Sequence, residues 1–317
     1  MLKFVFRRII NSIPIIILVM ILSFLIIHIM PGDPVRTMLG DKASEEQIIN
    51  MRKQLNLDKP LMKQFTIWIK DIIRFDFGES ISWKEPTLII IKERIEPTFL
   101  LAIIGTLLST LIGIPLGILS AKQHGKLTEK CLSVLSLVSI SLPAFWIAII
   151  MIQLFGVNIR IFPVSGFHSI KSVGLLASLY ELSLPGIILG IMHSGQIGRM
   201  TKTSMLEVMQ QDYLRTARAK GVKEFYVLNL HGLKNALSSI VVVIGFSFAS
   251  LLGGAIVIEQ IFNIPGVGNL AINSILSRDY PLIQGILLFI ALIFILINML
   301  TDIICALINP KVRYEHE

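Results

Sequence analysis

The 317-residue chain has few charged residues and lacks the common catalytic motifs. Charged residues make up only 16%, whereas a soluble domain carries about a quarter. The patterns G-x-x-x-x-G-K-[ST], H-E-x-x-H and G-x-S-x-G are absent. Their absence argues against a P-loop nucleotide site, the common zinc metalloproteases and the serine hydrolases. We therefore expect no catalytic residue and no cofactor.

Cysteine is also scarce, and its placement argues against a metal site. Cys131 and Cys305 have no metal-ligand spacing and form no disulfide framework. A relaxed G-x-G-x-x-A pattern occurs at residues 266–271. That fingerprint needs a preceding strand in a βαβ unit, and Ile264-Pro265 stands there instead, so we reject a dinucleotide site.

Long apolar runs are what the chain has in abundance. The hydrophobic fraction is 54% and the mean hydropathy is +0.75. A helix needs about 20 apolar residues to cross a bilayer, and six stretches are long enough. They are Ile9–Met30, Phe99–Ala121, Cys131–Phe155, Leu182–Arg199, Leu237–Ile258 and Leu282–Ile308. The predicted fold class is an all-α polytopic membrane protein with six transmembrane helices.

The first run resembles a signal peptide, since Lys3, Arg7 and Arg8 precede it. Its apolar stretch is too long for a typical signal sequence, and Pro31-Gly32-Asp33-Pro34 replaces a small-residue cleavage site. We interpret it as an uncleaved first helix.

The net charge of +8 predicts an orientation and not a nucleic-acid partner. No basic patch with interleaved aromatic residues occurs; the lysines and arginines flank apolar runs. The basic segments are the N-terminus, residues 122–130, residues 199–234 and the C-terminal tail. The positive-inside rule predicts that these four are cytoplasmic, with both termini inside and with residues 156–181 and 259–281 outside.

Prolines and glycines inside the runs are compatible with packed membrane helices. Neighbouring helices can satisfy the carbonyls freed by Pro14, Pro115, Pro143 and Pro185. The pairs Gly113–Gly117 and Gly186–Gly190 have the spacing that permits close helix approach, although this spacing also arises by chance.

Residues 31–98 are predicted to form a small extracytoplasmic helical subdomain. Ser44 and Gln47 make a capping-box pattern. Pro60 opens a second helix with an apolar stripe at Leu61, Phe65, Trp68, Ile69 and Ile72. Trp68 and Trp83 are expected at the outer interface. The domain prediction is residues 1–30, residues 31–98, and a core of residues 99–317 that contains a cytoplasmic loop at 200–235.

Polar residues at membrane depth are candidates for lining a solute path. His193 and Gln196 lie three residues apart on one helical face and are our candidates; an interhelical hydrogen bond is the competing interpretation. The alternative function is an ion-coupled secondary transporter. That class uses paired carboxylates and inverted repeats, whereas the one clear intramembrane carboxylate here is Asp302.

The loop at 200–235 has the most specific pattern. Ser204 and Glu207 predict the start of an amphipathic helix whose stripe is Leu206, Met209, Tyr213 and Ala217. Cations crowd its last turn, and Gly221 suits the left-handed position that ends a helix. A second helical run, residues 223–230, leads into the fifth span. From these residues alone, docking to another protein and lying on anionic lipid are equally good interpretations.

Several ordered motifs resemble the B-type permease subunits of dipeptide, oligopeptide and nickel ABC importers, and this resemblance favours protein docking. The motifs are Arg-Thr-Ala-Arg-Ala-Lys-Gly at 215–221, Pro-Gly-Asp-Pro at 31–34, Leu-Asp-Lys-Pro-Leu at 57–61, Asp-Phe-Gly-Glu-Ser at 76–80, Ser-Leu-Pro-Ala-Phe-Trp at 141–146, Glu-Gln-Ile-Phe at 259–262, Pro-Gly-Val-Gly at 265–268 and Arg-Asp-Tyr-Pro at 278–281. Two departures are Arg215-Thr216 in place of Glu-Ala of the general importer motif, and Asn309-Pro310-Lys311 in place of Asp-Pro-Arg.

The resemblance implies a type I ABC importer permease in the cell membrane of a prokaryote. A second homologous permease subunit, two cytoplasmic ATPase subunits, an extracytoplasmic solute-binding protein and membrane lipid would be its partners. ATP hydrolysis would belong to the ATPases, so the chain is not expected to be an enzyme. The implied ATPase-coupling residues are Leu206, Met209, Tyr213, Arg215, Thr216, Ala217, Arg218, Ala219, Lys220 and Gly221. The solute would be a peptide or a nickel-type metal complex.

Overall fold

A computed structural model describes residues 2–29, 35–36, 44–54 and 56–308. The motif at 31–34 and the segment at 309–311 lie outside these residues. In chain order the helices are α1 (Leu2–Ile29), α3 (Glu45–Gln54), α4 (Leu61–Ile73), α5 (Thr87–Lys122), α6 (Leu127–Ser141), α7 (Ala144–Met151), the π-helix η1 (Ile152–Asn158), α8 (Ile170–Val173), α9 (Leu175–Glu181), α10 (Ser183–Met209), α11 (Asp212–Ala219), α12 (Glu224–Tyr226), the π-helix η2 (Val227–Gly232), α13 (Leu233–Gly254), α14 (Ile256–Ile261), α15 (Val267–Leu276) and α16 (Tyr280–Ile308).

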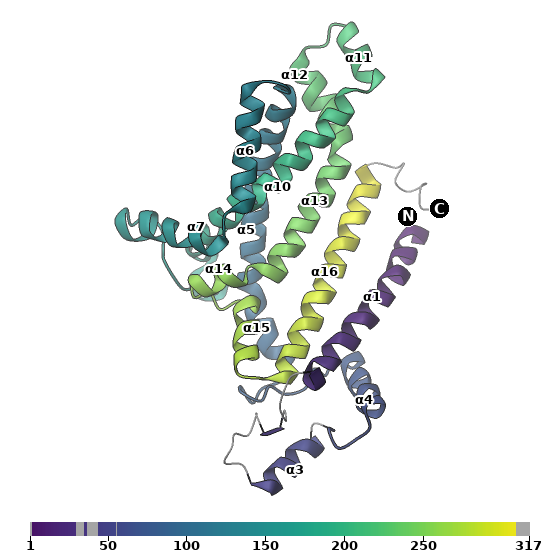
Figure 1. Ribbon diagram of the computed structural model, residues 1–317, viewed down its shortest axis with the longest axis vertical. Helices are drawn as coiled ribbons and strands as arrows, with labels where there is room; N and C mark the ends of the chain where they lie inside the picture. The colour runs from purple at the N-terminus through teal and green to yellow at the C-terminus, as the bar shows by residue number, and fades with distance from the viewer. Residues whose placement is uncertain (1, 30–34, 37–43, 55, 309–317) are drawn as a thin grey trace.

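The long helices form an elongated bundle with α11 at one end and α3 at the other (Figure 1). Among the described residues, four helical stretches are long and apolar enough to cross a membrane: residues 5–26, 87–122, 224–253 and 280–308. Two bent pairs raise the number to six if each pair is one span. The all-α fold with six candidate spans confirms the predicted class.

The third predicted span, Cys131–Phe155, is wrong as a straight helix. Helix α6 ends at Ser141, and α7 with η1 leaves it at 97° (Figure 1). Leu142 is extended (φ −73°, ψ 133°), as expected for a residue before proline, and Pro143 has no N–H to continue the ladder. Pro14 and Pro115, in contrast, lie inside helices as predicted.

Helices α5 and α10 pack at the centre of the bundle through the predicted glycines. A Cβ on Gly113 would lie 2.7 Å from the Ser194 carbonyl oxygen, and one on Gly117 would lie 2.5 Å from Thr201 Cβ. On the other helix, a Cβ on Gly186 would lie 2.4 Å from a methyl carbon of Ile104. Only glycine permits this approach, so both small-residue pairs mark a real contact.

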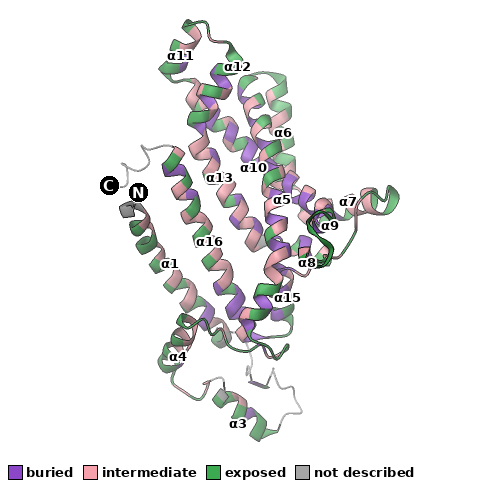
Figure 2. Cartoon of the chain, turned by 180° about the vertical axis from the view of Figure 1, so that it is seen from behind, coloured by how far each residue is buried: buried purple, intermediate pink, exposed green. Residues whose placement is uncertain are grey.

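The main core forms where α5, α10 and α13 meet and continues into α14. Leu101, Leu184, Ile188, Leu251 and Ile258 are all buried there. Many residues of α1, α6 and α7 are exposed (Figure 2), and large apolar residues such as Ile10, Leu135 and Trp146 are among them. This distribution is expected for a bundle whose outer faces contact lipid or other apolar surfaces.

The two ends of the described chain lie close together (Figure 1). Helix α1 packs along α16, and Arg8 Nη1 lies 2.8 Å from Asp302 Oδ2. The intramembrane carboxylate noted in the sequence is thus paired with a cation.

Helices α3 and α4 lie at the end opposite α11 (Figure 1). The predicted capping box is confirmed: the Gln47 N–H donates to Ser44 Oγ (3.2 Å), and the Ser44 N–H donates to Gln47 Oε1 (2.9 Å). Pro60 directly precedes α4, whose Phe65 and Trp68 rings contact Phe24 of α1.

Candidate functional site

The tip of the molecule, which we define as residues 210–226, projects beyond the ends of the long helices (Figure 1). It contains α11 and α12 and is anchored by one apolar side chain, Leu214, which is fully buried. Most other side chains of α11 are exposed, and Asp212 and Arg215 make only a surface ion pair at 3.5 Å. The tip therefore presents an exposed surface and is held to the bundle by the buried Leu214 side chain.

Gly221 ends α11 as the sequence predicts. Its φ is +77°, its N–H donates to the Arg218 carbonyl (2.9 Å), and the Val222 N–H donates to the Ala217 carbonyl (3.3 Å). These two bonds form a Schellman motif, which satisfies carbonyls that the end of a helix leaves free.

A bidentate ion pair then fixes the turn after Gly221. Arg218 Nε and Nη2 each donate to a different oxygen of Glu224 at 3.1 Å. This pairing raises the pKa of Arg218, so the guanidinium stays charged. Bidentate geometry restricts both side chains, and α11 is held rigidly to α12.

The predicted start of the loop helix at Ser204 is wrong. Ser204 lies buried inside α10, which continues to Met209. Leu206 and Met209 pack on a buried cluster that includes Ala121, Met205 and Ile240. The helix continues because it can bury these apolar side chains under α13 and because neither glycine nor proline interrupts residues 199–209.

The predicted coupling residues therefore divide into two groups. Leu206 and Met209 support the tip from within the chain, whereas Tyr213, Arg215, Thr216, Ala219, Lys220 and Gly221 are exposed on it. Ala217 and Arg218 are half-buried.

Two aromatic residues on the tip were missed by the sequence reasoning. Phe225 and Tyr226 are 69% and 54% exposed, and their rings contact each other edge to face. Two adjacent residues of one helical turn cannot both face a single core. The neighbouring pair Phe225-Tyr226 in the sequence was therefore a signal that an aromatic side chain is exposed. Exposed aromatic side chains of this kind are typical anchors of protein–protein interfaces.

An ion pair braces the same end of the bundle. Lys202 Nζ of α10 lies 2.5 Å from Glu129 Oε1 of α6 and 3.1 Å from the Ser133 hydroxyl. The other oxygen of Glu129 accepts from the Gly125 N–H at 2.6 Å. The turn between α5 and α6 is thereby tied to the helix that carries the tip.

His193 and Gln196 lie three residues apart within α10. His193 is half-buried and Gln196 is exposed. Neither lines the cavity beside Trp68 or the cavity beside Arg94.

Two buried carboxylates at the opposite end explain several of the sequence motifs. Glu259 accepts from the Thr98 hydroxyl (2.6 Å) and from the N–H groups of Gly268 and Asn269 in the first turn of α15. Asp279 accepts from the Ser80 hydroxyl (2.5 Å), the Ser82 N–H (2.9 Å) and the Leu282 N–H (3.3 Å) of α16. Both carboxylates cap helices, and Asp279 also fastens residues 80–82 to the bundle.

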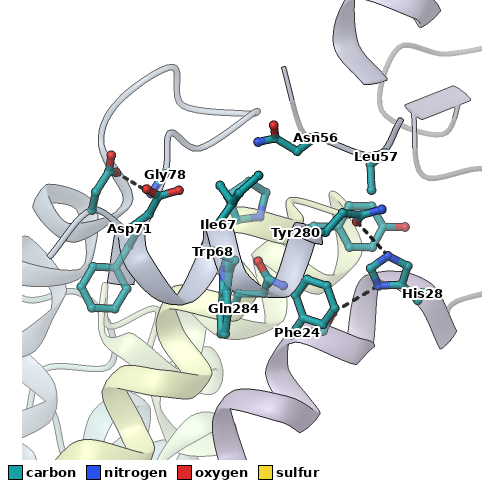
Figure 3. Close-up of a pocket in the computed structure, with 14 residues that line it drawn as sticks. Phe24, His28, Asn56, Leu57, Ile67, Trp68, Asp71, Gly78, Tyr280 and Gln284 are labelled. Atoms are coloured by element: carbon teal, nitrogen blue, oxygen red, sulfur yellow. Dashed lines mark hydrogen bonds between the residues drawn. The ribbon is translucent and has the colours of Figure 1, made fainter. Parts of the chain in front are cut away.

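A cavity of about 180 Å³ lies between α1, α4 and α16 (Figure 3). Its polar groups are largely engaged: His28 Nε2 lies 3.2 Å from Gln64 Oε1, and the Gln284 amide donates to the Ser23 carbonyl at 3.1 Å. Phe24 and Trp68 form its apolar wall (Figure 3). We interpret it as the seam that joins α4 to the bundle.

Comparison with known proteins gives the family. Residues 113–314 match the family described as binding-protein-dependent transport system inner membrane component, and residues 1–100 match its N-terminal membrane component. The "Probable peptide ABC transporter permease protein y4tP" of Sinorhizobium fredii is 39% identical over 98% of this chain and 99% of its own length. The "Glutathione transport system permease protein GsiC" of Salmonella choleraesuis is 38% identical over 99% of this chain and all of its own.

A solved structure shares the fold. The MetNI methionine ABC transporter in an inward-facing conformation aligns with a TM-score of 0.58 and 17% identity, over 69% of this chain and 96% of that one. The nearly full-length relatives confirm the expected family, and the shared fold agrees with the predicted type I importer architecture. The chain therefore belongs to the family of binding-protein-dependent transport system inner membrane components and is a multi-pass permease subunit of a prokaryotic ABC importer.

Proposed function

We propose that this subunit forms half of a translocation path for short peptides and that its tip, residues 210–226, docks separate ATPase subunits. The exposed tip carries the proposal: a rigid surface with Tyr213, Phe225 and Tyr226 projects from the bundle with no partner in the described chain to cover it. The peptide assignment is supported by the names of the two relatives, which refer to peptides and glutathione. Neither name refers to nickel.

The orientation follows from the charge pattern. Basic residues flank the tip and the α5–α6 turn, and the positive-inside rule places such segments in the cytoplasm, with both termini. The end with α3 and α4 would then face outward, where a solute-binding protein would deliver the peptide. Two ATPases would bind below the tip, and a second, similar permease would complete the path.

The domain division at residues 30 and 98 is retained as part of this proposal. The first helix and residues 31–98 would frame the outer side, and residues 99–317 would carry the path and the coupling segment at 200–235. His193 and Gln196 are proposed to line the path, because the described chain leaves both partly accessible on α10.

Movement of the tip would change the position of two long helices together. Helix α10 enters the tip, and the helical run from Glu224 through α13 leaves it. Because Leu214 and the Arg218–Glu224 pair make the tip rigid, an ATPase that shifts α11 would displace both helices. This is how closure of the ATPases could switch access to the path.

Two glycine variants test the proposal. A Cβ on Gly221 would meet no atom within 4 Å, but a β-branched residue at φ +77° is strained, so Gly221→Val would distort the tip alone. Gly125→Val is the matched control, because Gly125 has φ +82° and equally open surroundings in the α5–α6 turn.

The measurement is co-purification of the ATPases with the tagged permease from native membranes, followed by peptide uptake. Wild type and Gly125→Val are expected to retain the ATPases. Gly221→Val is expected to lose most of the co-purified ATPase subunits and most of the peptide uptake. Equal recovery of the ATPases with both variants would refute docking at the tip.

A further inference from the structure

An arginine without an anionic partner lies in an open cavity at the α15 end of the bundle. The cavity has a volume of about 420 Å³ and is formed by the start of α5, the segment around Phe167 and His168, and the turn into α15. This size falls within the range of small-molecule sites, roughly 300–1,000 Å³. Arg94 is the one lysine, arginine, aspartate or glutamate among its lining residues.

Arg94 has unused hydrogen-bonding capacity. Within the described part of the chain no hydrogen bond or ion pair of its guanidinium is found, and Nε is buried without an acceptor. The guanidinium lies 5.4 Å from the centre of the Trp83 ring, which positions it by a cation–π contact. A half-buried cation without a counter-ion is costly at a membrane surface, and the cost falls when an anion binds.

The nearby carboxylates are committed to other groups. Glu259 accepts from Thr98 and from α15, Glu96 accepts from the Ser169 hydroxyl and the Ile170 N–H, and Glu181 pairs with His168. These contacts leave Arg94 to an anion from outside the described chain.

The rest of the lining suits a short peptide. The Asn269 amide is engaged with Ile264 and Asn273, which fixes that wall. The Asn263 side chain has no hydrogen bond within the described residues, so its amide is available to a peptide group. Phe167 and Leu270 provide apolar surface beside these polar groups.

We propose that the cavity is a solute subsite in which Arg94 binds the carboxylate of a short peptide. A carboxylate accepts two parallel N–H bonds from a guanidinium, which a point charge such as lysine cannot reproduce. That this carboxylate belongs to a peptide rests on the proposed function in peptide transport. The concave shape favours a small solute over the surface of a docking protein.

Fluorescence of Trp83 provides a direct test on the importer assembled with its partner subunits in nanodiscs. The background Trp68→Phe, Trp146→Phe leaves Trp83 as the only tryptophan of this chain. Trialanine and its C-terminal amide are the probes. A saturable signal is expected with trialanine, with at least tenfold weaker apparent affinity for the amide.

Substitutions then assign the signal to Arg94. Arg94→Gln is expected to weaken trialanine binding at least tenfold, Arg94→Lys to be intermediate, and Lys92→Gln, an exposed control on the same helix, to have no effect. Equal affinity for acid and amide, or an unchanged Arg94→Gln titration, would overturn the subsite.

Two further measurements separate the alternatives. Arg94→Gln should leave the affinity of the solute-binding protein for the nanodisc-embedded importer unchanged. A tenfold loss of that affinity, with an unchanged Trp83 titration by trialanine, would make Arg94 a docking residue and overturn the proposal. Trialanine uptake tests peptide transport itself. Trialanine uptake without a change in Trp83 fluorescence would contradict the subsite. A fluorescence change without uptake would contradict the proposed function but would still support the carboxylate site.

Discussion

The Thr98 hydroxyl of α5 and the Glu259 carboxylate of α14 lie 2.6 Å apart and together cap α15. Thr98 Oγ1 also accepts a hydrogen bond from the Val267 N–H (2.9 Å), and the Glu259 carboxylate accepts from the N–H groups of Gly268 and Asn269. The first three donors of α15 are thus satisfied by side chains from two other helices. Both partners are buried, so water cannot replace either bond.

Thr98→Val should therefore destabilise the chain although it keeps the side-chain shape. A hydrogen bond to a charged group contributes about 1.5–3 kcal/mol, and an unpaired buried donor adds a cost at Val267. The measurement is the unfolding temperature of the protein in detergent. Thr98→Ser keeps the hydroxyl and is the control; equal unfolding temperatures for the two variants would contradict the capping role.

Asp279→Ala should release residues 80–82 from the bundle. The change removes the acceptor of the Ser80 hydroxyl and the Ser82 N–H and also uncaps α16, where loss of a cap costs about 0.5–2 kcal/mol. Hydrogen exchange at the Ser82 amide should accelerate by at least tenfold. Asp76→Ala removes only an exposed bond to the Gly78 N–H, so its Ser82 exchange should match wild type.

Gly117→Ala should force α5 and α10 apart. The added methyl carbon would lie 2.5 Å from Thr201 Cβ and 2.6 Å from the Gly198 carbonyl oxygen, which are parts of the helix wall. Overpacking of this kind costs about 1–3 kcal/mol, despite alanine's better helix propensity. Gly253→Ala is the control, because its nearest neighbour would be at 3.4 Å. Thermal unfolding should show opposite shifts for the two variants, and a stabilised Gly117→Ala would show that the helices can separate freely.

Replacing the tip aromatics should weaken ATPase docking without affecting the fold. Phe225→Ala and Tyr226→Ala remove exposed rings, and loss of an interface anchor costs about 2 kcal/mol or more, which is at least tenfold in affinity. Binding of purified ATPase to nanodisc-embedded permease measures the effect. Leu127→Ala is the control, since Leu127 is 75% exposed on α6 outside the tip. An unchanged affinity in both aromatic variants would place the docking surface elsewhere.

Local patterns predicted those features that depend on neighbouring residues in the chain. Apolar run lengths gave the number of candidate spans, and Ser44 with Gln47 gave a capping box that the structure contains. Gly221 was predicted to be left-handed because glycine suits the position that ends a helix, and its φ is +77°. The spacing of the glycine pairs indicated positions that permit close helix approach, and the structure shows that α5 and α10 meet there.

The errors arose where tertiary packing outweighed a local signal. Ser204 and Glu207 have the spacing of a helix start, but α10 continues past them because Leu206 and Met209 bury against a cluster assembled from α5, η2 and α13. Pro143 was expected to be tolerated within a span, as Pro115 is, yet it ends α6 at a right-angle bend. Neighbouring helices decide whether the carbonyls freed by a proline are satisfied, and the sequence around a proline does not reveal which helices will pack beside it.

The sequence by itself determined the membrane class, the number of candidate spans, the family and the loop that contains the tip, because apolar length and ordered motifs are properties of the chain alone. Only the tertiary structure decided that Glu259 and Asp279 cap helices, that Phe225 and Tyr226 are exposed, and that Arg94 lacks a counter-ion within the described residues. These features depend on which groups from distant parts of the chain meet. Hydrogen bonds and ion pairs act over a few ångströms in space, whatever the separation in sequence.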